Sequence, residues 1–159
     1  GDHSAAAVRY RQRATLGGWD EEVFVSLWQV GVCLIATNAP SSEIHSALLA
    51  AWEARPTRAE PLHRLAVWLR EQSRHHLAAM YARTAVNLDL PKDDVLFVDL
   101  DVYRWAAIDE LSIALYYTGD LEESAELCEA LLLNAFVPDS HRERITTNLE
   151  FARKGLGEN

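Results

Sequence analysis

Apolar residues recur at intervals of three and four along almost the whole chain, and the breaks between these periodic segments fall at turn residues. This spacing gathers apolar side chains on one side of an α-helix, whereas a half-buried strand requires strict alternation. We expect helices at residues 5–14, 20–37, 42–54, 57–72, 75–88, about 101–118, 121–134 and 140–155. The sequence therefore predicts an all-α fold in a single domain over residues 1–159.

Four helix starts carry residues that usually cap helices. Asp20 and Asp120 each precede an apolar periodic run. Thr57–Glu60 and Ser140–Glu143 have the Ser/Thr-x-x-Glu spacing of a capping box, in which two side chains satisfy free backbone N–H groups. We expect side-chain caps at all four places.

The three interior helix pairs begin again about every 35 to 45 residues, and their side-chain sizes can be aligned. Small residues that recur at one position of the first helix allow two helices to approach closely, and the large residues around them fill the grooves. The aligned sets in the first helices are Val30, Leu65 and Leu111, then Gly31, Ala66 and Ser112, then Leu34, Leu69 and Leu115. Those in the second helices are Ile44, Ala78 and Ser124, then Leu48, Ala82 and Cys128, then Ala51, Ala85 and Leu131, and Pro56, Pro91 and Pro138 close the units.

The segments EPLHRLA with HLAAMYARTA and IALYYTGDLEESAELCEALL resemble the tetratricopeptide repeat (TPR) family. The resemblance implies a right-handed solenoid of antiparallel helix hairpins, with about three repeats, a half repeat at residues 5–14 and a capping helix at 140–154. Two positions depart from the family pattern, since Ser124 stands where Ala is usual and Gly31 is the only glycine at the small first-helix position.

Four further segments, YRQRATLGGWDEEVF, AWEARPTRAEPL, LFVDLDVYRW and NLEFARKGL, are similar to the repeat region behind the catalytic domain of certain bacterial family-two glycosyltransferase proteins. The resemblance implies a noncatalytic scaffold for protein contacts, fused to or acting beside a glycosyltransferase catalytic domain. We therefore expect the chain to be a fragment of a longer protein.

Residues 95–103, VLFVDLDVY, present the main alternative, because they deliver Asp99 and Asp101 after a short apolar run. On a strand these two carboxylates would share a face, as in a metal-dependent transferase or a phosphatase. One isolated strand cannot form a sheet, and no partner strand is evident. We therefore expect a linker whose apolar residues pack at the joint between two repeats and whose Asp99 or Asp101 caps the next helix.

In the TPR family the first helices line a concave surface that binds extended peptides. By the alignment, the residues that face inward here are Trp28, Val32, Ile35, Ala36, His63, Val67, Arg70, Glu71, Asp109, Ile113, Tyr116 and Tyr117. We select Trp28, His63, Arg70, Asp109, Tyr116 and Tyr117 as the candidate peptide-binding groove. Chaperone-binding members hold a carboxylate with Asn and Lys, which this wall lacks, so we expect a hydrophobic or aromatic segment as the ligand.

Charge and cysteine content narrow the remaining possibilities. The net charge of −9 and the scattered basic residues argue against a nucleic-acid partner. We expect no metal, no cofactor and no membrane span. Cys33 and Cys128 lie far apart in apolar segments, which favours buried free thiols in a reducing cytoplasm. The helix near residues 23–36 is apolar almost all round, so we expect this edge to form a homodimer, or another self-assembly, or to dock on the catalytic domain.

Overall fold

The computed structural model describes residues 2–157, which form eight α-helices and one short π-helical segment without any β-strand. The elements are α1 (His3–Thr15), α2 (Asp20–Ala36), α3 (Ser41–Ala54), α4 (Glu60–Glu71), α5 (His75–Val86), η1 (Val102–Ala106), α6 (Ala107–Thr118), α7 (Leu121–Leu133) and α8 (Asp139–Gly155). The predicted all-α fold is confirmed. Within these residues no helix has the length and apolar character that a membrane crossing requires.

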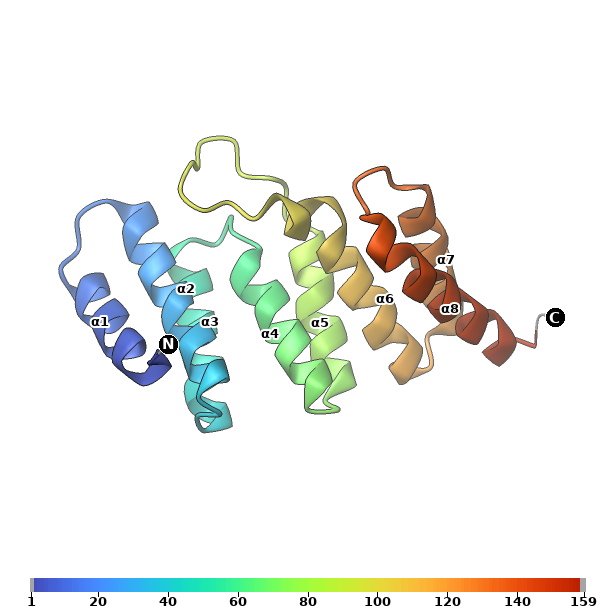
Figure 1. The fold of residues 1–159 in the computed structure, drawn as a ribbon, viewed down its shortest axis with the longest axis horizontal. Helices are drawn as coiled ribbons and strands as arrows, with labels where there is room; N and C mark the ends of the chain where they lie inside the picture. Colours follow the sequence, from blue (N-terminus) through green and yellow to red (C-terminus); the bar gives the residue numbers. More distant parts are fainter. Residues whose placement is uncertain (1, 158–159) are drawn as a thin grey trace.

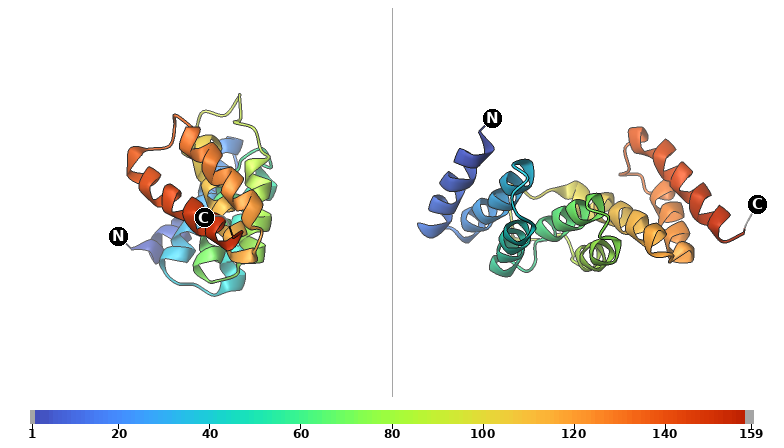
Figure 2. Two further views of the ribbon diagram at one scale, coloured as in Figure 1. Left: turned by 90° about the vertical axis from the view of Figure 1, so that its right-hand side faces the viewer. Right: turned by 90° about the horizontal axis from the view of Figure 1, so that it is seen from below.

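The helices follow one another in space in chain order, from α1 at one end of an elongated row to α8 at the other (Figure 1). Each helix packs on the next, and further contacts join α2 to α4, α4 to α6 and α6 to α8. In the view from below, α1 and α8 rise on the same side of the row, so the row is bent (Figure 2). The first helices of the predicted pairs therefore form a continuous layer.

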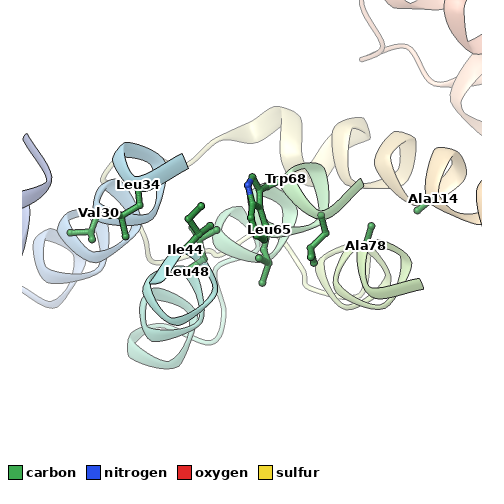
Figure 3. Packing of buried hydrophobic residues seen from close by; sticks show 9 residues of the cluster. Val30, Leu34, Ile44, Leu48, Leu65, Trp68, Ala78 and Ala114 are labelled. Atoms are coloured by element: carbon green, nitrogen blue, oxygen red, sulfur yellow. The ribbon is translucent and has the colours of Figure 1, made fainter. Parts of the chain in front are cut away.

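The core confirms the register of the alignment, because every aligned position in α2 to α7 is buried. Figure 3 shows how residues such as Val30, Leu48 and Leu65 of successive helices meet in one cluster. Gly31 marks the closest approach, since a Cβ atom added there would lie 2.4 Å from Leu48 Cδ2. Ser124 replaces the usual Ala without leaving a free hydroxyl, because its Oγ donates to the Ser112 carbonyl at 2.8 Å. Small residues thus set the spacing between helices, as the size pattern predicted.

The two predicted capping boxes are wrong. Helix α4 begins at Glu60 after Ala59, and no side chain caps it. The Glu60 carboxylate instead accepts hydrogen bonds from Arg58, so it is not available for a capping box. Helix α8 begins at Asp139, which places Ser140 inside the first turn and not before it.

The two single-residue caps are also absent. Asp20 is already the first residue of α2, and Trp19 precedes the helix. Asp120 does stand at the N-cap of α7 but caps no backbone N–H. Its Oδ2 accepts from the Thr118 hydroxyl at 2.7 Å instead.

The segment after α5 is a linker, as expected, and its apolar residues behave differently from the prediction. Asp99 Oδ1 accepts the backbone N–H of Asp101 at 3.2 Å and so caps the helical turn that leads into η1. Val95 and Phe97 do not pack at the joint, since they are 77% and 69% exposed. The reason is that buried side chains hold the backbone of this segment, as described below.

Candidate functional site

The twelve positions predicted to face a groove lie on α2, α4 and α6, and only Asp109 among them is buried. The other eleven are half-buried or exposed. Helical spacing explains this result. At 3.6 residues per turn, the positions three before, one after and four to five after the small residue lie roughly 40° to 140° to one side of it, at the edge of the buried face and beyond. The layer formed by these three helices thus carries a partly accessible stripe.

The two charged residues chosen for the groove are each neutralised by a neighbour. Arg70 Nε lies 2.7 Å from Glu110 Oε1 and joins α4 to α6. Arg144 donates to Asp109 from Nη1 to Oδ1 at 3.1 Å and from Nη2 to Oδ2 at 2.8 Å, which joins α8 to α6. Burial raises the pKa of Glu110, and Arg70 opposes that change. These pairs connect alternate helices of the row and leave little net charge along the stripe.

His63 and Trp28 provide apolar surface more than polar chemistry. Burial lowers the pKa of His63, with Asp99 acting in the opposite direction, so the imidazole is neutral at pH 7. Trp28 stacks on Phe24 with ring centroids 6.4 Å apart. Its buried Nε1 finds no hydrogen-bond acceptor among residues 2–157. Neither residue is positioned to hold a charged ligand.

Tyr116 and Tyr117 are brought together in a pocket of about 110 Å3 between α6 and α8. Their rings meet edge to face at a centroid distance of 5.3 Å, and Phe151 of α8 lies 6.4 Å from Tyr116. Tyr117 and Phe151 remain 58% and 53% exposed. The complete lining is Ser112, Ile113, Tyr116, Tyr117, Ser124, Asn148 and Phe151. This pocket has an apolar wall and an exposed aromatic rim, which suits one aliphatic or aromatic side chain.

Three residues of this region were not predicted from the sequence. His75 of α5 stacks on Tyr117 with ring centroids 4.3 Å apart. Phe151 and Asn148 come from α8, whose register was not part of the repeat alignment. Their spacing of three on a helix was the available signal, since it places both on one face.

Asp99 and Asp101 do not form a metal centre in the geometry observed. The first is the helix cap described above, and the second is exposed within the first turn of the same helical segment. No group of three His, Cys, Asp or Glu side chains in residues 2–157 is arranged to hold a metal ion. The predicted free thiols Cys33 and Cys128 are buried, and burial raises the pKa of each.

A network of hydrogen bonds and ion pairs holds the linker after α5, which we call the strap (residues 89–101). Arg58 is fully buried, and its guanidinium donates to the carbonyls of Leu96 at 3.3 Å and Phe97 at 3.0 Å. Glu21 Oε2 accepts the N–H groups of Val95 at 2.9 Å and Leu96 at 2.7 Å. Side chains from α2 and from the loop just before α4 therefore bind backbone groups of this segment that no strand partner binds.

The strap is also held by its own acid and by the turn that follows it. Asp94 pairs with both Arg55 and Arg58, and the Arg55 hydrogen bond is the largest cause of the lowered pKa of Asp94. Glu60 accepts the Asp99 N–H at 3.1 Å and the Tyr103 hydroxyl at 2.8 Å. Burial raises the pKa of Tyr103, which keeps this hydroxyl protonated. The anchor cluster, Glu21, Arg55, Arg58, Glu60, Asp94 and Tyr103, thus joins three distant segments of the chain.

Comparisons with models of protein families, with curated proteins and with solved structures found no match.

Proposed function

We propose that the chain is a noncatalytic interaction scaffold, a TPR-like right-handed solenoid that binds a hydrophobic or aromatic segment of a protein partner along α2, α4 and α6. The burial of every aligned core position supports the repeat assignment. Each helix packs on the next, and the first helix of each pair also contacts the first helix of the following pair. Stacked helical hairpins produce this arrangement.

The observation that carries the binding proposal is the aromatic pocket between α6 and α8. Exposed aromatic rings that flank an apolar pocket are typical of the anchor positions that dominate binding energy. The volume of about 110 Å3 accommodates one apolar side chain. The side-chain amide of Asn148 makes no hydrogen bond with residues 2–157, and it can both donate to and accept from a bound peptide backbone.

The proposed context is a bacterial glycosyltransferase, which the domain accompanies or to which it is fused in the cytoplasm. The support is the resemblance of four sequence segments. Three of them contain members of the anchor cluster: Glu21 lies in the first, Arg55, Arg58 and Glu60 in the second, and Tyr103 in the third. Residues of these three segments thus take part in holding the strap.

The binding proposal is tested by selection of displayed twelve-residue peptides on the purified chain, followed by titration of the selected peptides. We expect peptides rich in Leu, Phe, Tyr or Trp that lose affinity for Phe151→Asp by about tenfold or more. Phe136→Asp is a matched control, because Phe136 is 56% exposed and lies outside the pocket. Equal affinity for Phe151→Asp and the unmodified chain, or selection of peptides without apolar residues, would contradict the proposal.

A further inference from the structure

The innermost wall of the pocket between α6 and α8 offers no hydrogen-bond donor. Ser112 and Ser124 line the pocket and are each 1% exposed. The Ser112 hydroxyl donates to the Asp109 carbonyl at 2.8 Å, and the Ser124 hydroxyl donates to the Ser112 carbonyl at 2.8 Å. A carboxylate or carbonyl oxygen that reached this wall would therefore find no donor, and a buried polar group without a partner costs free energy. The inner wall thus favours an apolar side chain.

The aromatic wall of the pocket is held in place from both sides. The Tyr117 ring stacks on His75 with a centroid distance of 4.3 Å and an interplanar angle of 14°. Its other neighbour is Tyr116, which it meets edge to face at 5.3 Å. An outward movement of Tyr117 would separate it from both rings. These contacts therefore limit how far the pocket can widen on the α6 side.

The size of the pocket separates aliphatic from aromatic side chains, although the chemistry of its wall suits both. Its volume is about 110 Å3. A buried apolar cavity of about 150 Å3 in another protein binds benzene. The side chains of Val, Leu and Ile have fewer carbon atoms than benzene, whereas those of Phe and Trp have more. A branched aliphatic side chain can therefore enter completely, while an aromatic ring would remain partly outside.

Ile113 is the residue of the lining that best accounts for this limit. It is the one aliphatic side chain in the lining that residues 2–157 form, and it is half-buried. Within residues 2–157 it holds no neighbour by a side-chain hydrogen bond, so its bulk is its contribution to the pocket. We propose, as an inference that rests on the function proposed above, that this pocket takes a Val, Leu or Ile side chain of the partner in preference to an aromatic one. Ile113 determines this specificity.

The test is NMR titration of the purified chain with the capped peptides acetyl-Gly-Gly-X-Gly-Gly-amide, in which X is Val, Leu, Ile, Phe or Trp. Shifts of the Asn148 side-chain amide signals report occupancy of this pocket. We expect the Leu peptide to bind at least about tenfold more tightly than the Phe and Trp peptides. General hydrophobicity favours the opposite order, because aromatic side chains bury more apolar area. A preference for Leu therefore reports the size of the pocket.

Ile113→Ala enlarges the pocket, so it should bring the affinity of the Phe peptide to at least that of the Leu peptide. Val67→Ala is the matched control, because Val67 occupies the aligned position on α4, is also half-buried and lies outside the pocket. The Val67→Ala chain should keep the tenfold preference for Leu found in the unmodified chain. Circular dichroism of both variants checks that the helical fold is kept.

The possible failures of this inference and of the proposed function differ in what the titration shows. Binding of the Phe or Trp peptide at this pocket as tightly as the Leu peptide would overturn the aliphatic preference and leave the peptide-binding function standing. A preference for Leu that survives Ile113→Ala would overturn the role of Ile113. Absence of Asn148 shifts with every peptide would overturn the binding function of the pocket, and this inference with it.

Discussion

The Arg58 guanidinium and the Glu60 carboxylate form a two-point ion pair in which neither side chain reaches solvent, with Nη2 2.8 Å from Oε1 and Nε 3.0 Å from Oε2. The same guanidinium lies 4.5 Å above the centroid of the Phe24 ring. Arg58 and Glu60, at the beginning of α4, thus form the centre of a contact among α2, α4 and the strap. Two fully buried charged side chains are tolerated only when each keeps its ion-pair and hydrogen-bond partners.

Arg58→Ala should lower the free energy of unfolding by about 3–5 kcal/mol, because it leaves Glu60 buried without its counter-ion and releases the Leu96 and Phe97 carbonyls. Arg58→Lys should recover little of this loss, since an ammonium group cannot form the two-point contact. Urea denaturation measures both variants. Arg153→Ala removes the pair with Glu129, in which both side chains are about half exposed, and should cost at most about 1 kcal/mol. Equal losses of unfolding free energy for Arg58→Ala and Arg153→Ala would show that breaking the buried pair costs no more than breaking an exposed one.

The parts of the fold that follow from side-chain size could be predicted, and those that depend on distant partners could not. Alternation of large and small residues reports directly which side of a helix is buried, so the register of α2 to α7 was correct. Thr57–Glu60 has the sequence of a local cap, whereas Glu60 in the structure binds Tyr103, 43 positions away. No local pattern reports such a partner. The groove stripe was placed by the same alignment, and Asn148 and Phe151 were missed because α8 lies outside the repeat.

Gly31→Ala should reduce stability by about 1–3 kcal/mol through overpacking, because the new methyl group would overlap Leu48, whose side chain is fully buried. In a Leu48→Ala background the same change should be neutral or stabilising. The reason is that the space around residue 31 is then open and Ala favours a helix over Gly by about 1 kcal/mol. Denaturant unfolding of the four chains in this double-mutant cycle measures the coupling. A Gly31→Ala effect that is the same in both backgrounds would rule out the close approach of α2 and α3 as its cause.

Asp99→Ala should cost about 1 kcal/mol of stability, because it removes the cap on the Asp101 N–H. The loss should be the same with and without magnesium or manganese, since the carboxylate acts on the backbone. Thermal unfolding with each ion and with a chelator measures this, and Asp101→Ala, which removes no side-chain hydrogen bond, is the control. Manganese binding to the wild-type chain that disappears in Asp99→Ala would instead favour a metal-dependent role for the two aspartates.

Asp94→Asn should produce a stability difference from wild type that depends on pH in a defined direction. Arg55 and Arg58 lower the pKa of Asp94 in the folded chain, so the unfolded chain binds this proton more readily. The resulting stabilisation is fully present above the unfolded pKa of about 3.9 and is lost as the pH falls through the lower folded pKa. Urea midpoints at a series of acidic pH values should therefore show wild type and Asp94→Asn converging below about pH 4, where the carboxylate takes up its proton. A difference between wild type and Asp94→Asn that stays constant down to the lowest pH would mean that the strap is held by the shape of this side chain and not by its charge.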